Sequence, residues 1–206
     1  MGLEADVILD KVFGDGDVKS AGTGQDVRPI PAALRLFASV FEREADEKLL
    51  GELTARRQEI ENVLGGDPLA GIDPGDAASA LEVLAVEYCR LFIGPRDHLP
   101  PVESVVLGEE QFWGPSTRKV VEFYRTVGLA QREDSRIMPD HLSMELDCMA
   151  MLEETDRRDQ ASELASKHVL KWAPLLAKHV SERATIAFYP VWMTGLLAMV
   201  TELYDA

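Results

Sequence analysis

The stretch RIMPDHLSMEL, residues 136–146, contains the clearest helix start in the sequence. Proline suits the first turn of a helix, where its missing N–H loses no hydrogen bond, and Pro139 precedes an apolar run. Asp140 follows at a position where a carboxylate accepts amide hydrogens and faces the positive end of the helix dipole. We therefore predict a helix over residues 139–155 with Asp140 at its N-terminus.

Apolar residues with helical spacing extend from this stretch in both directions. Leu34, Phe37 and Phe41 share one helical face, and no segment shows the period of two that is typical of strands. Further helical segments are predicted at 77–92, 115–126, 159–180, with a bend at Pro174, and 186–204. The sequence thus predicts an all-α, compact single-domain multi-helix bundle over residues 29–206. Residues 1–28, rich in glycine and aspartate, are expected to form a flexible N-terminal lead.

The charge balance restricts the class of partner. The chain has 21 basic and 36 acidic residues, a net charge of −15, which argues against nucleic-acid binding and favours a cationic partner. The N-terminus lacks the basic and apolar regions of an export signal, so we expect a cytoplasmic protein. The uncharged window 184–201 is interrupted by Pro190 and Gly195, and we expect a buried helix there and no membrane span. Cys89 and Cys148 match no zinc or disulfide pattern and are expected to be core thiols.

His141 is the first residue to test for chemistry, because it lies between two carboxylates, Asp140 and Glu145. Their charges favour the protonated ring and the helix dipole disfavours it, so we expect a pKa near the ordinary value and a switch close to neutral pH. A Cys148 nucleophile is excluded, because seven helical residues separate it from His141 by about 10 Å. No nucleophile elbow, phosphate loop or metal motif is present. We therefore expect no catalytic residue and no metal ligand.

Several separated motifs together resemble one known family. They are EYCRLFIGP (87–95), PPVESVVLG (100–108), MPDHLSMEL (138–146), HVLKWAP (168–174) and FYPVWMTGLLAMV (188–200). In order and spacing they resemble the TorD/DmsD family of molybdoenzyme maturation chaperones. The resemblance implies an all-helical chaperone without enzymatic turnover. It also implies that the chain binds the twin-arginine leader and the apo form of a molybdopterin-containing oxidoreductase, assisting cofactor insertion and proofreading before export.

Carried over by position, the resemblance separates a binding set from a structural set. The peptide-binding set is Leu91, Phe92, Gly94, Pro95, Asp140 and His141, to which we add Glu145. The motif residues of structural role are Glu87, Tyr88, Pro101, Glu103, Ser104, Pro139, His168, Trp172 and Pro174. The double-proline segment departs from the family pattern, since Val102 and Val106 stand where relatives often carry an aromatic residue.

The physical argument for a leader receptor is independent of the resemblance. A twin-arginine leader presents guanidinium groups followed by an apolar segment, so its receptor needs carboxylates beside an apolar surface. Two alternatives stay open: a nucleotide- or pterin-cofactor-binding protein or enzyme that uses His141 as acid/base, and an all-α protein–protein adaptor. We expect no cofactor beyond a weak nucleotide or molybdopterin contact, and either a monomer or a swapped dimer.

Overall fold

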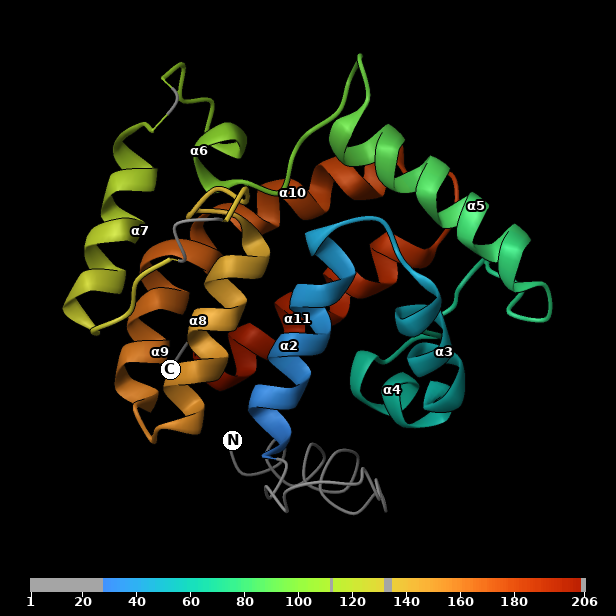
Figure 1. Cartoon of the computed structure of the whole chain (residues 1–206), viewed down its shortest axis with the longest axis horizontal. Helices are drawn as coiled ribbons and strands as arrows, with labels where there is room; N and C mark the ends of the chain where they lie inside the picture. Colours follow the sequence, from blue (N-terminus) through green and yellow to red (C-terminus); the bar gives the residue numbers. More distant parts are fainter. Residues whose placement is uncertain (1–27, 112, 132–134, 205–206) are drawn as a thin grey trace.

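The computed structural model describes residues 28–111, 113–131 and 135–204, and over these residues it is helical, with one isolated bridge between Val102 and His141 (Figure 1). Its helices are α2 (Pro29–Glu42), α3 (Glu47–Ala55), α4 (Arg57–Leu64), α5 (Ala77–Tyr88), α6 (Glu103–Val106), α7 (Pro115–Thr126), α8 (Leu142–Glu154), α9 (Arg158–Leu164), α10 (Leu170–Arg183) and α11 (Phe188–Tyr204). This confirms the predicted all-α bundle. The lead predicted for residues 1–28 lies outside the described residues, except for Arg28.

The core forms around α2, which packs extensively on α8 and also contacts α11 (Figure 1). The helical face of α2 predicted from its spacing is buried, with Leu34, Phe37 and Phe41 at most 2% exposed. Leu146 and Met149 of α8 are fully buried. The remaining helices surround these three and cover most of their apolar surface, as burial of apolar area requires.

Local signals account for several helix ends. Pro115 begins α7 and Gly128 follows its end with φ +72°, as predicted, because glycine adopts the left-handed conformation at no steric cost. Asp46 accepts the amide hydrogen of Leu49 at 2.9 Å and caps α3. Such caps satisfy the amide groups that have no partner within the helix.

Two helices predicted as continuous each contain a π-turn. The segment 77–92 becomes α5 followed by η1 (Cys89–Ile93), and the segment 159–180 becomes α9, η2 (Ala165–Val169) and α10. Pro174, where a bend was predicted, lies inside α10, and the change of direction between α9 and α10 occurs at η2 (Figure 1). A π-turn inserts one extra residue into the hydrogen-bond pattern of a helix, and the spacing of apolar residues in the sequence does not reveal it.

The last helix is a core element. In α11, Tyr189, Trp192 and Leu196 are at most 1% exposed, and Trp192 Nε1 donates to the carbonyl oxygen of Pro68 at 3.0 Å. Among the described residues, no helix is long and apolar enough to cross a membrane. The expectation of two core thiols is half wrong, because Cys148 is buried but Cys89 is exposed on η1.

Candidate functional site

Asp140 caps a different helix from the one predicted. Its carbonyl oxygen accepts the amide hydrogen of Glu103 at 2.8 Å, and its carboxylate accepts that of Ser104 at 2.9 Å, so it holds the start of α6. The helix predicted from residue 139 begins at Leu142 instead. The reason is a β-turn: the amide of His141 donates to the carbonyl oxygen of Met138 at 3.1 Å, which places the proline at the position where turns favour it.

His141 is the N-cap of α8. Its Nδ1 accepts the amide hydrogen of Ser143 at 3.2 Å and lies 2.9 Å from the Ser143 hydroxyl. Burial lowers the pKa of His141 to about 4, against the opposing charge of Asp140. The predicted switch near neutral pH is therefore wrong, because local sequence shows neighbouring charges but not the loss of water around the ring.

Three buried side chains from distant segments meet behind this turn. We call Glu103, Glu145 and His168 the carboxylate–histidine cluster; one ligating atom from each lies within 4.8 Å of the others. His168 Nδ1 lies 2.8 Å from Glu103 Oε2, and Trp172 Nε1 donates to Glu145 Oε2 at 3.1 Å. Burial, together with the charge of Glu103, raises the pKa of Glu145 well above its ordinary value. Each member is at most 5% exposed, so the cluster lies inside the protein.

The cluster borders a hollow of about 510 Å³ between α6, α7 and the segment from α9 to α10. Glu103 and His168 line it from the cluster side. The other lining residues are Leu107, Ser116, Lys119, Glu122, Phe123, Thr126, Glu163, Lys167 and Lys171. Sequence reasoning missed the three lysines, although the i, i+4 spacing of Lys167 and Lys171 would place both on one helical face. The hollow gives the cluster a route to the surface.

The structure separates the first motif from this cluster. Leu91 and Phe92 are 0% and 2% exposed, and Phe92 packs against Tyr189 with ring centroids 5.3 Å apart. Gly94 is buried and Pro95 is exposed. The two leading residues of the predicted peptide-binding set thus fill the core and do not line a surface.

Glu87, Tyr88 and the loop after η1 attach this motif to the rest of the fold. Glu87 accepts hydrogen bonds from Arg90 and from both the amide and the hydroxyl of Thr185, while the Tyr88 hydroxyl donates to the carbonyl oxygen of Phe41 at 3.1 Å. The loop over residues 94–102 is fastened at both ends. The amide of Leu99 donates to the Leu91 carbonyl oxygen, and that of Leu142 to the carbonyl oxygen of Pro101, each at 2.8 Å.

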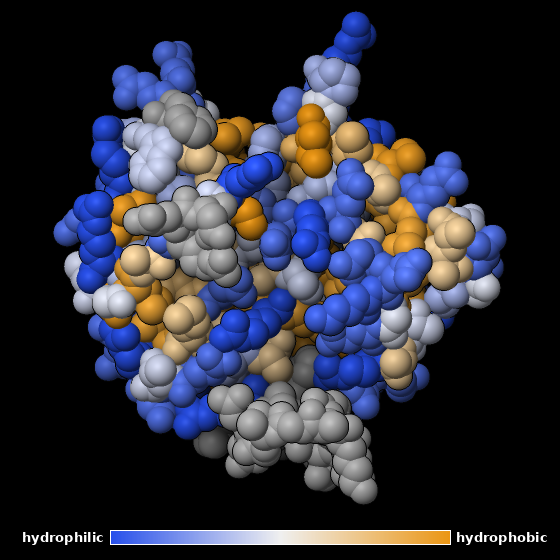
Figure 2. Space-filling model, viewed as in Figure 1, coloured by the Kyte–Doolittle hydropathy of each residue, from blue (hydrophilic) through white to orange (hydrophobic). Residues whose placement is uncertain are grey.

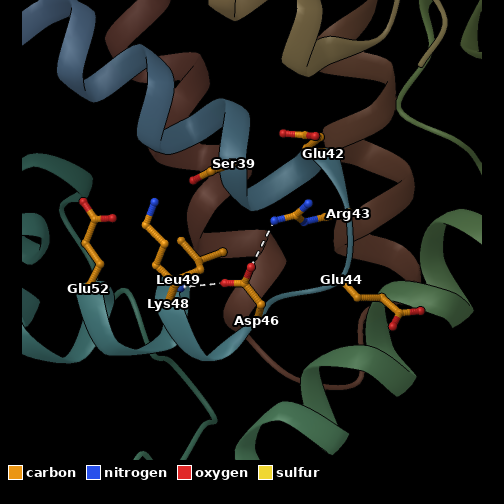
Figure 3. A pocket seen from close by; sticks show the side chains of 8 residues that line it. All are labelled: Ser39, Glu42, Arg43, Glu44, Asp46, Lys48, Leu49 and Glu52. Carbon is orange, nitrogen blue, oxygen red and sulfur yellow. Dashed lines mark hydrogen bonds and ion pairs between the residues drawn. The ribbon is translucent and has the colours of Figure 1, made fainter. Parts of the chain in front are cut away.

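A second hollow, of about 120 Å³, lies between the end of α2 and the start of α3 (Figure 3). It is lined mainly by charged side chains, but Asp46 is already paired with Arg43 at 3.0 Å and caps the next helix. Figure 3 shows the side chains of Glu42 and Glu44 pointing away from that carboxylate and from each other. This hollow therefore offers no converging set of ligands.

The main candidate site is thus where three of the sequence motifs converge. Glu103 comes from the double-proline segment, Asp140, His141 and Glu145 from the stretch 138–146, and His168 from the stretch 168–174. The Ser143 hydroxyl lies 2.9 Å from His141 Nδ1, but that nitrogen already accepts the Ser143 amide hydrogen as the cap of α8, and both side chains are buried. The arrangement suits binding and positioning.

Comparison with known proteins agrees with this conclusion. A family model described as the nitrate reductase delta subunit matches residues 33–182. The chaperone protein TorD of Shewanella piezotolerans is 25% identical over 203 residues, which cover 89% of this chain and 94% of that protein. A crystal structure described as a candidate redox enzyme maturation protein from Archaeoglobus fulgidus matches with a TM-score of 0.55 and 25% identity, covering 88% of this chain and 97% of that one. The chain therefore belongs to the nitrate reductase delta subunit family, the TorD/DmsD family of molybdoenzyme maturation chaperones, and is a chaperone rather than an enzyme.

Proposed function

We propose that this chaperone binds the twin-arginine leader of a molybdopterin-containing oxidoreductase in the cytoplasm and holds the apo-enzyme until the cofactor is inserted. A maturation chaperone needs a partner enzyme, and family membership supplies that coarser statement. Export of a folded, cofactor-loaded client makes the leader the natural segment to hold back. The leader proposal needs a surface with carboxylates beside exposed apolar side chains.

The outer face of α5 and η1, which we call the α5 surface, has this composition. Val83, Val86 and Ile93 are 40%, 62% and 57% exposed, and Figure 2 shows apolar surface over this part of the molecule. Two exposed carboxylates lie nearby: Asp76 is the N-cap of α5, and Glu82 lies within the helix. An apolar leader segment would cover the valines and the isoleucine while its guanidinium groups pair with the carboxylates. These exposed apolar side chains, of which Ile93 lies in the motif 87–95, are the observation that carries the proposal.

The buried members of the predicted binding set support this surface from below. Leu91 and Phe92 fix η1 on the core, and Pro95 begins the loop that continues from it. Asp140 holds the far end of that loop through the amides at the start of α6. We therefore assign Asp140, His141 and Glu145 a positioning role, because they are buried and do not reach a peptide on the α5 surface.

The test is calorimetric binding of a synthetic twin-arginine leader to the full chain. The double variant Val86→Asp, Ile93→Asp is expected to bind at least about tenfold more weakly, a loss of about 1.4 kcal/mol. The matched control is Val105→Asp, which changes an equally apolar side chain, 43% exposed, on α6. That control should bind as the wild type does, since α6 lies outside the α5 surface.

Two further arms examine the charge contribution. A leader with both arginines replaced by lysine should bind more weakly, because lysine lacks the bidentate geometry that matches a carboxylate. Raising the salt concentration should also weaken binding. Wild-type affinity in the double variant would reject the α5 surface, and failure of the wild type to bind any leader would reject leader binding itself.

A further inference from the structure

The carboxylate–histidine cluster brings two acidic groups together inside the protein. Two glutamates, Glu103 and Glu145, lie side by side at 3% and 0% exposure, with one imidazole, that of His168, in contact. Because a buried carboxylate loses its hydration, two adjacent ones need a compensating cation or proton. The cluster is therefore a place where a positive species is expected.

One oxygen of Glu145 lacks a donor. Oε2 accepts from Trp172, but Oε1 is buried without a hydrogen-bond partner. Glu103 lies within hydrogen-bond reach of the Glu145 carboxyl group, but two ionised carboxylates are both acceptors, so a bond between them requires a proton on one of them. A fully buried oxygen of this kind indicates a missing proton, water or ion at that position. The unpartnered oxygen lies in the same small volume as the clustered acidic groups.

The donor set matches a divalent first-row metal ion. Two carboxylate oxygens and an imidazole nitrogen are borderline ligands that suit zinc, manganese or iron(II). The 2.8 Å between Glu103 Oε2 and His168 Nδ1 is a hydrogen-bond distance, and the two atoms would move slightly apart to share one ion with bonds of about 2.0–2.2 Å. Two carboxylates neutralise a charge of +2, and the Trp172 bond would orient Glu145 as outer-shell donors do.

An ion has a route to this position. Glu103 and His168 belong to the cluster and also line the 510 Å³ hollow, so two of the three ligands border it, while Glu145 is fully buried. The wall of the hollow is mixed in charge: Lys167 pairs with Glu163 at 2.6 Å, and Lys119 and Glu122 lie on α7. The hollow thus connects the cluster to bulk water.

We propose that Glu103, Glu145 and His168 bind one divalent transition-metal ion. The ion links α6, α8 and η2, and so fixes three of the five segments that carry the family motifs. This replaces the expectation of no metal ligand, which rested on sequence spacing alone. The site does not depend on leader binding, and the two are tested by separate measurements.

The experiment uses the full chain, stripped with a chelator and titrated with Co²⁺ and then Zn²⁺. We expect saturable binding at one ion per chain, visible Co²⁺ ligand-field absorption without a thiolate charge-transfer band, displacement by Zn²⁺, and a raised unfolding temperature. Glu145→Gln keeps the side-chain volume and an acceptor for Trp172, and should weaken binding at least about tenfold. The matched control Glu163→Gln removes an exposed carboxylate from the same hollow and should leave the affinity unchanged.

Several outcomes would overturn the site. Absence of saturable one-to-one binding by the wild-type chain would show that the cluster holds a shared proton only. Equal affinity in wild type and Glu145→Gln would place the ion elsewhere, and a thiolate band would assign it to Cys89 or Cys148. If Glu145→Gln fails to fold, the affinity of His168→Asn replaces it in the comparison, and weakened binding is again expected. The Co²⁺ spectrum of the wild-type chain tests the ligand set without any variant.

Discussion

At the scale of single residues, His141 caps α8 as a neutral ring. Nδ1 accepts the amide hydrogen of Ser143, and an imidazolium has no lone pair for that bond. Burial lowers the pKa of His141 to about 4, whereas the unfolded chain has the ordinary value of about 6.5. The unfolded state therefore binds more protons between these two values. The stabilisation that the neutral His141 ring adds to the folded state is complete above about pH 6.5 and is lost as pH falls toward 4.

The variant His141→Asn separates capping from titration. Asparagine is a good N-cap but does not titrate, so the cap is kept and the pH dependence removed. Relative to this variant, the wild-type free energy of unfolding should fall by about 2 kcal/mol between about pH 7.5 and pH 5. Denaturant unfolding of both proteins at the two pH values measures the difference. A gap that stays constant with pH would contradict the lowered pKa of His141.

Asp140 shows what single-residue reasoning from sequence omits. A carboxylate after Pro139 is correctly identified as a capping group, but its partners, Glu103 and Ser104, lie 36 or more residues earlier in the chain. Capping rules describe the helix that follows, and here the turn at residues 138–141 directs the carboxylate to another helix. The chemistry of the residue was predictable; its partner required the tertiary fold.

At the scale of helices, the approach of α11 to α4 depends on a glycine. A Cβ built on Gly195 would lie 2.5 Å from Leu64 Cδ2 and 3.3 Å from Leu64 Cα, so the side chain and the backbone would both have to move. Gly51, in the middle of α3, has nothing within 4 Å of the same added atom. The two glycines form a matched pair, one required by packing and one not.

Alanine at these positions should have opposite effects. Gly195→Ala is expected to lower the free energy of unfolding by about 1–3 kcal/mol through overpacking against Leu64. Gly51→Ala should raise it by about 0.5–1 kcal/mol, because alanine is the better helix former. Thermal or denaturant unfolding of both variants measures the pair. Equal stabilisation by the two substitutions would show that α4 and α11 are not in close contact at residue 195.

Helix positions were largely predictable and helix interruptions were not. The bounds of α7 follow from Pro115 and Gly128, which mark its start and end. The π-turns η1 and η2 contain neither proline nor glycine, and apolar residues continue at helical spacing through both. Their positions depend on packing: Phe92 must reach Tyr189, and His168 must reach Glu103. The candidate cluster was therefore beyond sequence reasoning, although each of its members lies in a motif.

At the scale of the molecule, the two proposed sites lie on parts of the fold that we expect to differ in local stability. The cluster joins α6, α8 and η2 beside the central contact of α2 with α8, where most side chains are buried. The α5 helix lies at the periphery (Figure 1), and its first two turns bury only Ala80 and Leu84 fully. Stability is thus expected to be concentrated at the cluster and lower at the surface proposed for the leader.

Hydrogen exchange followed by mass spectrometry can measure this difference. Amides in the middle of α2 and α8 should exchange only through global unfolding, because their side chains are buried on several neighbours. Amides in the first half of α5 should exchange faster, at least about tenfold, through local opening that leaves the core intact. Leader peptide bound to the α5 surface should slow exchange in α5 and leave α2 unchanged, since α2 already exchanges at the global limit. Equal protection of α5 and α8 in the free chain would contradict a peripheral α5, and protection gained only in α6 and α7 would move the leader to the hollow beside the cluster.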